Sequence, residues 1–396
     1  MNAVVATAGL RIAPPRLATV PPLSLYVHIP WCVRKCPYCD FNSHESRGPL
    51  PEARYVNALI ADLEAALPLI WGRRVHTVFF GGGTPSLLSS AALDTILSAV
   101  RALLPLPPDA EITLEANPGT FEVAKFAAFR KLGVNRLSIG IQSFNPAHLR
   151  ALGRIHDAAE AVRAIEIARS EFDNFNLDLM YALPGQTLSE ALADIHCAVQ
   201  YAPRHISAYH LTLEPNTLFH RFPPQLPDHD AAAAMQAGIE SELARAGYRQ
   251  YETSAFCMPG GQAKHNVNYW QFGDYLGIGA GAHSKISSHE RIVRQIRHKH
   301  PQAYLEKVAA GSAVMESNDV GSDDLSFEFM MNALRLTEGF AVRLFEERTG
   351  LPLALLHKDL EIAEARGLIN RDHLHIAPSE LGRRFLNDLL QIFLHD

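Results

Sequence analysis

The strongest constraint on the fold is a strand-like segment that recurs about every 36 residues in the first half of the chain. The six copies begin at residues 24, 76, 111, 136, 174 and 205 and read SLYVHIP, HTVFFGG, EITLEAN, RLSIGIQ, NFNLDLMYALPG and HISAYHLTLEP. Short apolar runs bounded by glycine, proline or asparagine are typical of buried strands. The interval matches a βα unit, which needs about 30 or more residues.

Helical periodicity fills the intervals between these segments. Apolar residues recur at helical spacing in YVNALIADLEAAL, LDTILSAVRALL and AAEAVRAIEIAR, and VAKFAAFRKLGVNRLSIG reads as helix, glycine stop and strand. Consecutive βα units form a parallel sheet. We therefore predict an α/β fold with a partial (β/α)6 barrel over residues 23–222. An open doubly wound sheet is the alternative, because strand order is not visible in a sequence.

The pattern changes on either side of this core. Residues 1–22 read as an irregular lead-in, with a short organelle-targeting peptide as the alternative. Residues 223–310 follow Phe222, the first residue of the proline-rich FPPQLPDHD, and read as a linker together with the segment HNVNYW and the glycine-rich GDYLGIGAGAHS. Residues 311–396 are expected to form a mostly helical, winged-helix-like domain. Its nucleic-acid-binding interpretation is weaker than a packing role, because the chain carries a net charge of −6 and no basic cluster.

Cysteine usage and hydropathy indicate a protein of a reducing compartment, with cytoplasm as the expected location. No apolar run reaches the ~18–20 residues that a membrane helix needs. Three of the five cysteines lie within eight residues, which is not the pattern of a secreted disulfide framework.

The crowded cysteines Cys32, Cys36 and Cys39 have the spacing C-x3-C-x2-C on a loop that leaves the first strand. Three thiolates at this spacing suit an iron–sulfur cube, which ordinarily takes four, so one iron would keep an open position. A zinc site completed by His28 or His44 is the second interpretation. Three structural cysteines without a metal are the third. Spacing alone leaves all three open.

The sequence around these cysteines resembles the radical S-adenosylmethionine (SAM) superfamily, whose signature is C-x3-C-x-aromatic-C, here with Tyr38. The segments SLYVHIPWC, FFGGGTPSLL, LEANPGT, RLSIGIQSFN, LGRIH, NLDLMYALPGQT and HISAYHLTLEPNT follow in the order of one family. That family comprises oxygen-independent coproporphyrinogen III oxidase and the HemW haem chaperones, and the resemblance covers residues 22–390. It implies a [4Fe-4S] cluster on the three cysteines, with SAM on the open iron.

The resemblance also implies a set of SAM contacts near the carboxyl ends of the strands. Glycines after the second strand allow a ligand to approach the backbone, although a plain strand-to-helix turn reads the same way. A strand-end carboxylate is as often a structural cap as a ligand. Together these side chains would gather on one face of a barrel. They are Tyr26, Gly82, Gly83, Thr84, Glu115, Gln142, Arg154 and Asp178.

Two features separate the members of this family. Phe41 stands where the oxidase motif is expected to have a fourth cysteine, and the lead-in is short. The motif H-N-x-x-Y-W, formed by His265, Asn266, Tyr269 and Trp270, is associated with HemW and with haem, and imidazole is a common axial ligand of haem iron. A buried aromatic loop is the alternative interpretation of this motif.

We therefore expect a haem chaperone that holds a [4Fe-4S] cluster, SAM and haem. The alternative is oxygen-independent coproporphyrinogen III oxidase, and a zinc-stabilised interaction module is the third hypothesis. The expected partners are haem, a haem-acceptor protein and an electron donor, with a transient homodimer and without nucleic acid.

Overall fold

Six parallel strands form the centre of the structure, as the repeat predicts. This computed structural model describes residues 16–119 and 123–394, so residues 1–15 of the predicted lead-in lie outside it. The six strands are β1 Leu23–Ile29, β4 Val75–Gly82, β5 Glu111–Ala116, β6 Arg136–Gln142, β7 Phe175–Tyr181 and β8 His205–His210. They are hydrogen-bonded in chain order, and every neighbouring pair is parallel.

Residues 223–310, read from the sequence as a linker, contribute strands at both sides of this sheet. β11 pairs with β1 in parallel, with Leu23 opposite Asp274, and β12, β13 and β14 continue in antiparallel order. The other side is extended by β10 and β9, so the sheet ends at β14 and β9 as a partial barrel. The strands from this segment are β9 Arg249–Glu252, β10 Ala255–Cys257, β11 Asp274–Ile278, β12 His283–Ser287 and β13 Ile292–Arg297. β14 Val314–Asp319 comes from residues that the sequence pattern places in the C-terminal domain.

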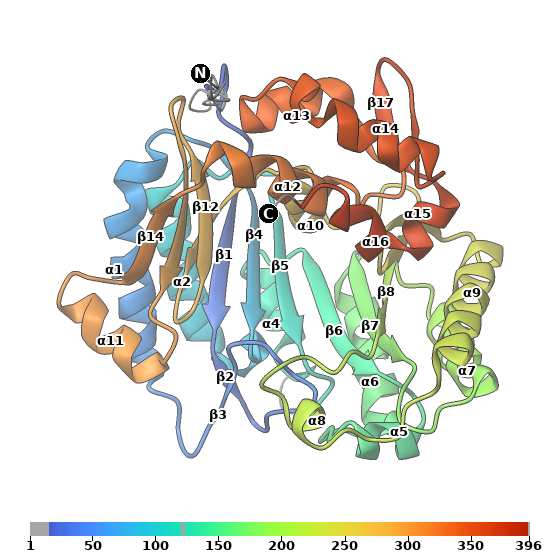
Figure 1. Cartoon of the computed structure of the whole chain (residues 1–396). Coiled ribbons are helices and arrows are strands. Elements are labelled where there is room, and N and C mark those ends of the chain that lie inside the picture. Colours follow the sequence, from blue (N-terminus) through green and yellow to red (C-terminus); the bar gives the residue numbers. More distant parts are fainter. Residues whose placement is uncertain (1–15, 120–122, 395–396) are drawn as a thin grey trace, which may run out of the picture.

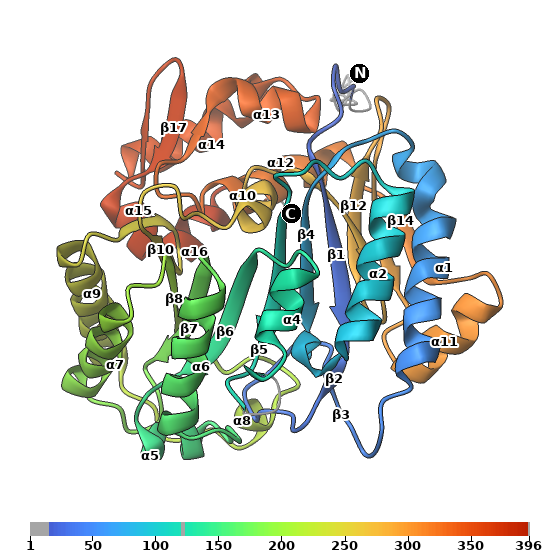
Figure 2. The same cartoon turned by 180° about the vertical axis from the view of Figure 1, so that it is seen from behind.

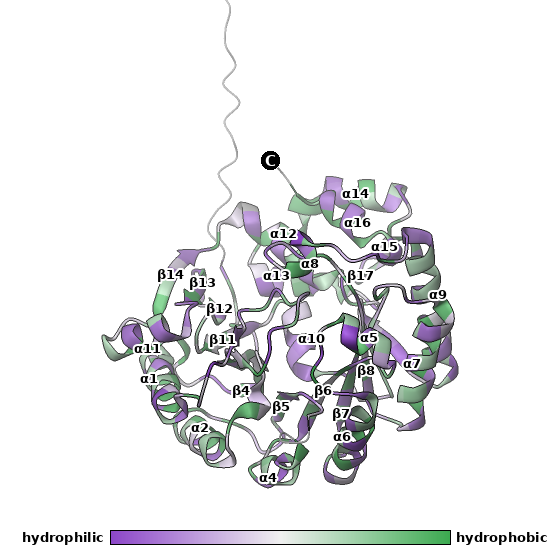
Figure 3. Ribbon diagram, turned by 90° about the horizontal axis from the view of Figure 1, so that it is seen from below, coloured by the Kyte–Doolittle hydropathy of each residue, from purple (hydrophilic) through white to green (hydrophobic). Residues whose placement is uncertain are grey.

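Helices cover the outer face of the sheet (Figures 2 and 3). Several of them begin at a side-chain cap; for example, Thr187 and Glu190 form a capping box that begins the helix after β7. Both faces of the sheet are buried, and apolar residues alternate along the strands with buried polar ones; on β1, for example, Leu25 and Val27 alternate with Ser24 and His28. The outer helices are α1 Glu52–Ile70, α2 Ser90–Leu103, α4 Phe126–Lys131, α5 Pro146–Ala151, α6 Ala158–Glu171, α7 Leu188–Gln200, α9 His229–Arg245 and α11 Pro301–Ala309.

The C-terminal residues form a helical domain with its own small sheet, as expected for a winged-helix-like unit. Its sheet has the order β15-β17-β16, and its apolar core also takes in Leu17 of the lead-in and Phe272. Figure 1 shows this domain over the amino-terminal ends of the barrel strands. Its elements are α12 Ser322–Ala333, β15 Phe340–Ala341, α13 Val342–Thr349, η2 Leu353–Leu356, α14 His357–Ala365, β16 Ile369–Arg371, β17 His375–Pro378, α15 Glu380–Arg384 and α16 Leu386–Gln391.

The cysteine segment lies at the other end of the barrel. The arrows of β1, β4 and β5 in Figure 1 point toward β2 Trp31–Cys32 and β3 His44–Glu45, with the short helices α8 Leu218–Arg221 and η1 Pro85–Leu87 at the same end. Carboxyl ends of parallel strands are where loops assemble binding sites. None of the described helices has the length and apolar character to cross a bilayer.

Candidate functional site

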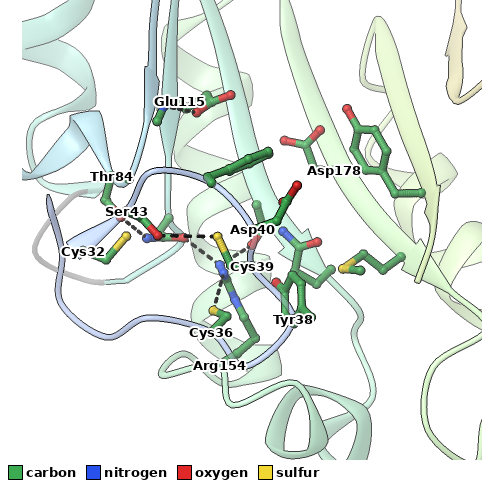
Figure 4. A pocket seen from close by; sticks show the side chains of 18 of the residues that line it. Cys32, Cys36, Tyr38, Cys39, Asp40, Ser43, Thr84, Glu115, Arg154 and Asp178 are labelled. Carbon is green, nitrogen blue, oxygen red and sulfur yellow. Dashed lines mark hydrogen bonds between the residues drawn. The ribbon is translucent and has the colours of Figure 1, made fainter. Parts of the chain in front are cut away.

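A cavity of about 360 Å³ at the carboxyl ends of the barrel strands brings the predicted site residues together (Figure 4). All three clustered cysteines line it, and so do seven of the eight predicted SAM-contact residues. Tyr26 is the exception: it lies next to the cavity wall, where a Cβ added to Gly81 would meet Tyr26 Cε2 at 3.0 Å and Glu115 Oε2 at 3.2 Å. The lining residues among the predictions are Cys32, Cys36, Cys39, Gly82, Gly83, Thr84, Glu115, Gln142, Arg154 and Asp178.

The cysteine loop is closed at its base by a short pair of strands. β2 and β3 pair in parallel, with Cys32 opposite Glu45, and the Ser46 amide donates to the Cys32 carbonyl at 2.9 Å. Within the loop, the Cys39 amide donates to the Cys36 carbonyl at 3.2 Å. All three cysteines are free thiols. The loop therefore holds three potential thiolate ligands on one short segment.

Arg154 is the cation that faces these sulfurs. Its Nη1 donates to Cys36 Sγ at 3.6 Å, while Nη2 donates to Asn117 Oδ1 at 2.6 Å and to the Gly140 carbonyl at 2.8 Å. Burial raises the pKa of Cys32, and a hydrogen bond with Thr84 opposes that shift. The positive charge of Arg154 also opposes the rise in the pKa of Cys32. The thiolate is the form of cysteine that binds metal.

The donor set suits a cluster better than a single ion. Among the described residues, no group of three His, Cys, Asp or Glu side chains lies close enough to hold one metal ion. The two histidines considered for zinc are engaged elsewhere: His28 Nε2 lies 2.9 Å from the Asn42 carbonyl, and His44 Nε2 lies 3.2 Å from Asn42 Oδ1. Three thiols spread around one cavity fit an iron–sulfur cube, whose irons take separate thiolates.

Two carboxyl groups line the other wall of the cavity. Burial, and then the negative charge of Asp178, raise the pKa of Glu115 to about 8, although the Gly82 amide donates to Glu115 Oε2 at 3.2 Å. Burial also raises the pKa of Asp178, whose oxygens accept from Ser138 Oγ at 2.9 Å and Asn176 Nδ2 at 2.8 Å. At pH 7 Glu115 is thus mostly protonated until a cation approaches it.

The glycine turn after β4 packs directly on the start of the cysteine segment. Gly82 has φ +112°, and a Cβ there would lie 2.5 Å from the ring of His28. A Cβ on Gly83 would lie 2.6 Å from the Trp31 carbonyl oxygen, to which the Thr84 amide donates at 2.8 Å. Only glycine fits both the backbone conformation and the space at residue 82.

The HNxxYW motif lies outside this cavity, in α10 Lys264–Trp270, next to the amino-terminal ends of β4 and β5. His265 is buried, and its Nδ1 lies 2.7 Å from Thr77 Oγ1. Among the described residues its Nε2 has no hydrogen-bond partner. Burial lowers the pKa of His265 to about 3, so the ring is neutral. The carboxylate of Glu111 accepts hydrogen bonds from the backbone amides of Lys264 and His265.

The aromatic residues of the motif contact the C-terminal domain and the neighbouring strand. The Arg335 guanidinium lies over the Trp270 ring at 4.3 Å, and the rings of Tyr269 and Tyr275 are 4.2 Å apart. Asn266 is half-buried in the same helix. The motif therefore joins two parts of the protein at the end of the barrel opposite to the cysteines.

Comparison with known proteins places the chain in a family. Residues 26–198 match the radical SAM superfamily and residues 321–385 match the HemN C-terminal domain. The haem chaperone HemW of Escherichia coli K12 is 48% identical over 380 residues, which cover 96% of this chain and 100% of that protein. The chain belongs to the HemW haem chaperone family. HemW of Haemophilus influenzae is 47% identical over 383 residues, covering 95% of this chain and 98% of its own.

The relationship to the HemW family confirms the predicted family and fold. The structure of coproporphyrinogen III oxidase (HemN) from E. coli, a radical SAM enzyme, matches with a TM-score of 0.81 at 25% identity, covering 94% of this chain and 90% of that one. Membership of the radical SAM superfamily implies a [4Fe-4S] cluster and SAM, which the three-thiol cavity fits.

Some lining residues were missed by sequence reasoning. Asn117, which directly follows β5, orients both Arg154 and Thr84, since its Oδ1 accepts from the former and its Nδ2 donates to Thr84 Oγ1 at 3.0 Å. Ser138 lies two residues after Arg136 on β6 and also lines the cavity. The two-residue period of β6 is a signal for Ser138, but the role of Asn117 becomes visible only with its partners in place.

Proposed function

We propose that this protein is a haem chaperone that binds haem and passes it to an acceptor protein. Cys32, Cys36 and Cys39 would hold a [4Fe-4S] cluster, and exchangeable SAM would bind beside it. The observation that carries the proposal is the 48% identity to a haem chaperone over nearly the whole of both chains. The three free thiols around one cavity support the cluster.

The surroundings of each predicted SAM contact support a role in binding. When bound, the cluster and SAM supply one-electron chemistry that side chains do not provide. Gly82 and Gly83 line the cavity, and Arg154, which donates to Cys36 Sγ, would balance negative charge on the thiolates. The carboxyl of Glu115 would release its proton and pair with the ammonium group of SAM. Asp178 and Gln142, which also line the cavity, would bind polar groups of SAM.

A haem-transfer experiment tests the chaperone function. The anaerobically reconstituted protein is loaded with ferric haem and mixed with an apo-haemoprotein, and formation of the holo-acceptor is followed by absorbance. Transfer should be faster than from the same concentration of haem on serum albumin, which controls for passive release. Absence of haem binding, or transfer no faster than from albumin, would contradict the proposal.

The contribution of the HNxxYW motif to haem binding stays a prediction. His265 is buried here, so direct ligation of haem iron would require α10 to move. Haem titration of wild type and His265→Ala, each with its cluster reconstituted, is the measurement. Unchanged affinity in the variant would remove His265 from the candidate ligands.

Oxygen-independent coproporphyrinogen III oxidase is the second candidate, because the HemN structure matches so much of the fold. Phe41, in place of the cysteine expected in the oxidase motif, lines the cavity with 60% of its surface exposed. We expect no protoporphyrinogen when coproporphyrinogen III, SAM and a reductant are supplied anaerobically. Turnover would instead assign the oxidase activity to this chain.

A further inference from the structure

A second cavity lies on the other side of the cysteine loop, between β3 and the start of α11. Both elements are in the lower left part of Figure 1. The cavity has a volume of about 790 Å³, within the range of small-molecule sites. Its apolar lining comes from two segments more than 240 residues apart in sequence: Trp31, Pro49, Leu50, Pro51, Pro301 and Leu305.

Two imidazole groups line this cavity together. The rings of His44 and His300 lie 5.5 Å apart at 76°. His300 is exposed, and its ring nitrogens have no hydrogen-bond or ion-pair partner within the described part of the chain, so they are available to a ligand. Burial, followed by the neighbouring His300 and Lys35, lowers the pKa of His44, which keeps that ring neutral at pH 7. Neutral imidazole is the form that ligates iron.

Two cations border the same cavity. Lys35 and Arg47 are both exposed, and within residues 16–119 and 123–394 neither forms an ion pair with a carboxylate. Lys35 Nζ donates only to the carbonyls of Phe41 and Ser43, at 3.2 and 3.1 Å. Glu45 is the one acidic residue in the lining. An apolar cavity with free imidazole and unpaired cations suits a flat apolar ligand that carries a metal and carboxylates.

We propose that this cavity is the haem-docking site, with His300 as an axial ligand, His44 beside it, and Arg47 and Lys35 pairing with the propionates. The assignment rests on the proposed haem chaperone function. The proposed site differs from the buried HNxxYW motif, because a ligand can reach its imidazoles without any movement of a helix. Ser43 lines this cavity and the cysteine cavity alike, and its Oγ lies 3.5 Å from Cys39 Sγ. Haem here would therefore sit next to the cluster loop.

The test is a ferric haem titration of four reconstituted proteins: wild type, His44→Ala/His300→Ala, His265→Ala, and His373→Ala/His375→Ala. The last is a matched control, because it removes two exposed histidines of the C-terminal domain. We expect His44→Ala/His300→Ala to weaken haem binding by at least about tenfold, or about 1.4 kcal/mol, and to lose the Soret band of histidine-ligated haem. The other variants should bind as wild type.

A second variant tests the site independently if the double substitution disturbs the cysteine loop. Arg47 is exposed, and Arg47→Ala should weaken haem binding about two- to fivefold, as expected for an exposed ion pair. The same variant should bind haem dimethyl ester, which lacks the carboxylates, as wild type does. Cluster absorbance in each variant shows whether the loop is intact.

The outcomes separate the two hypotheses. If wild type binds no haem, the chaperone proposal fails and this site fails with it. If wild type binds haem but His44→Ala/His300→Ala retains both affinity and Soret band, the site is wrong while the chaperone function stands. Loss of binding only in His265→Ala, with a cluster spectrum equal to that of wild type, would assign haem to the HNxxYW motif and overturn the site.

Discussion

Glu115→Gln is the substitution for which the structure gives the clearest quantitative expectation. The ordinary pKa of a glutamate is 4.5, whereas burial and Asp178 raise the pKa of Glu115 to about 8 in the folded protein. Between these values the folded chain keeps a proton that the unfolded chain has released. Stability from this group is therefore fully present below pH 4.5 and is lost as the pH rises toward 8. Glutamine, which does not titrate, removes this dependence.

The size of the effect follows from the two pKa values. Each pH unit in the window is worth about 1.4 kcal/mol, so the penalty from Glu115 grows by about 3.5 kcal/mol between pH 5 and pH 8. Glu115 is half-buried and faces a cavity, and solvent screening reduces this value. We expect the ligand-free Glu115→Gln protein to gain about 2–3 kcal/mol relative to wild type over that range.

Denaturant unfolding of ligand-free wild type and variant at pH 5, 6, 7 and 8 measures this difference. Glu64→Gln, at an exposed position of α1, is the matched control and should show no such trend. The variant should also bind SAM at least about tenfold more weakly, because it loses a charge-assisted hydrogen bond. A stability difference that stays constant with pH, or that falls toward pH 8, would refute the electrostatic reasoning.

Two further predictions concern the cysteine loop and the turn packed on it. Cys36→Ser should lose most cluster iron and sulfide after anaerobic reconstitution, whereas Cys197→Ser in α7 should keep both; equal iron content in the two variants would contradict the assignment. Gly82→Ala should destabilise the protein by about 1–3 kcal/mol from backbone strain, with a further cost from the contact with His28. Gly185 has φ +69°, against +112° at Gly82, and open space around it, so the smaller loss of Gly185→Ala in denaturant unfolding measures the strain of a positive φ without a steric clash.

The sequence predicts the parallel strands well because their signals are local. β5 Glu111–Ala116 and β6 Arg136–Gln142 match the predicted segments EITLEAN and RLSIGIQ, and the helix α4 between them ends just before Gly133, the predicted glycine stop. The order of the strands outside the repeat could not be predicted in this way. The pairing of β11 with β1 joins Asp274 to Leu23, 251 residues apart, and nothing in GDYLGIGAGAHS indicates that partner.

In the candidate site, too, residues close in sequence could be predicted, whereas residues brought together by packing could not. Cys32, Cys36 and Cys39 are close in sequence, so their spacing indicates a metal site, and the family resemblance then implies the cluster. The second cavity depends on residues 44–51 meeting residues 300–305, which only the packing of α11 beside α1 brings together. His44 and His300 could not be recognised as site residues from the sequence, because single surface histidines are common in proteins. The structure was needed to find them.

The position of the HNxxYW motif also governs how its variants should be interpreted. The ring of His265 stacks on Phe79 at 4.9 Å, and Phe79 in turn lies 6.2 Å from the ring of Tyr26. Tyr26 bonds through its hydroxyl to His28 Nδ1 at 3.0 Å, and His28 Nε2 reaches the Asn42 carbonyl in the cysteine loop. Since these contacts run from the motif to the loop, a substitution at His265 can weaken haem binding by disturbing the loop. Weaker binding in His265→Ala therefore supports direct ligation only if the cluster spectrum of the variant equals that of wild type.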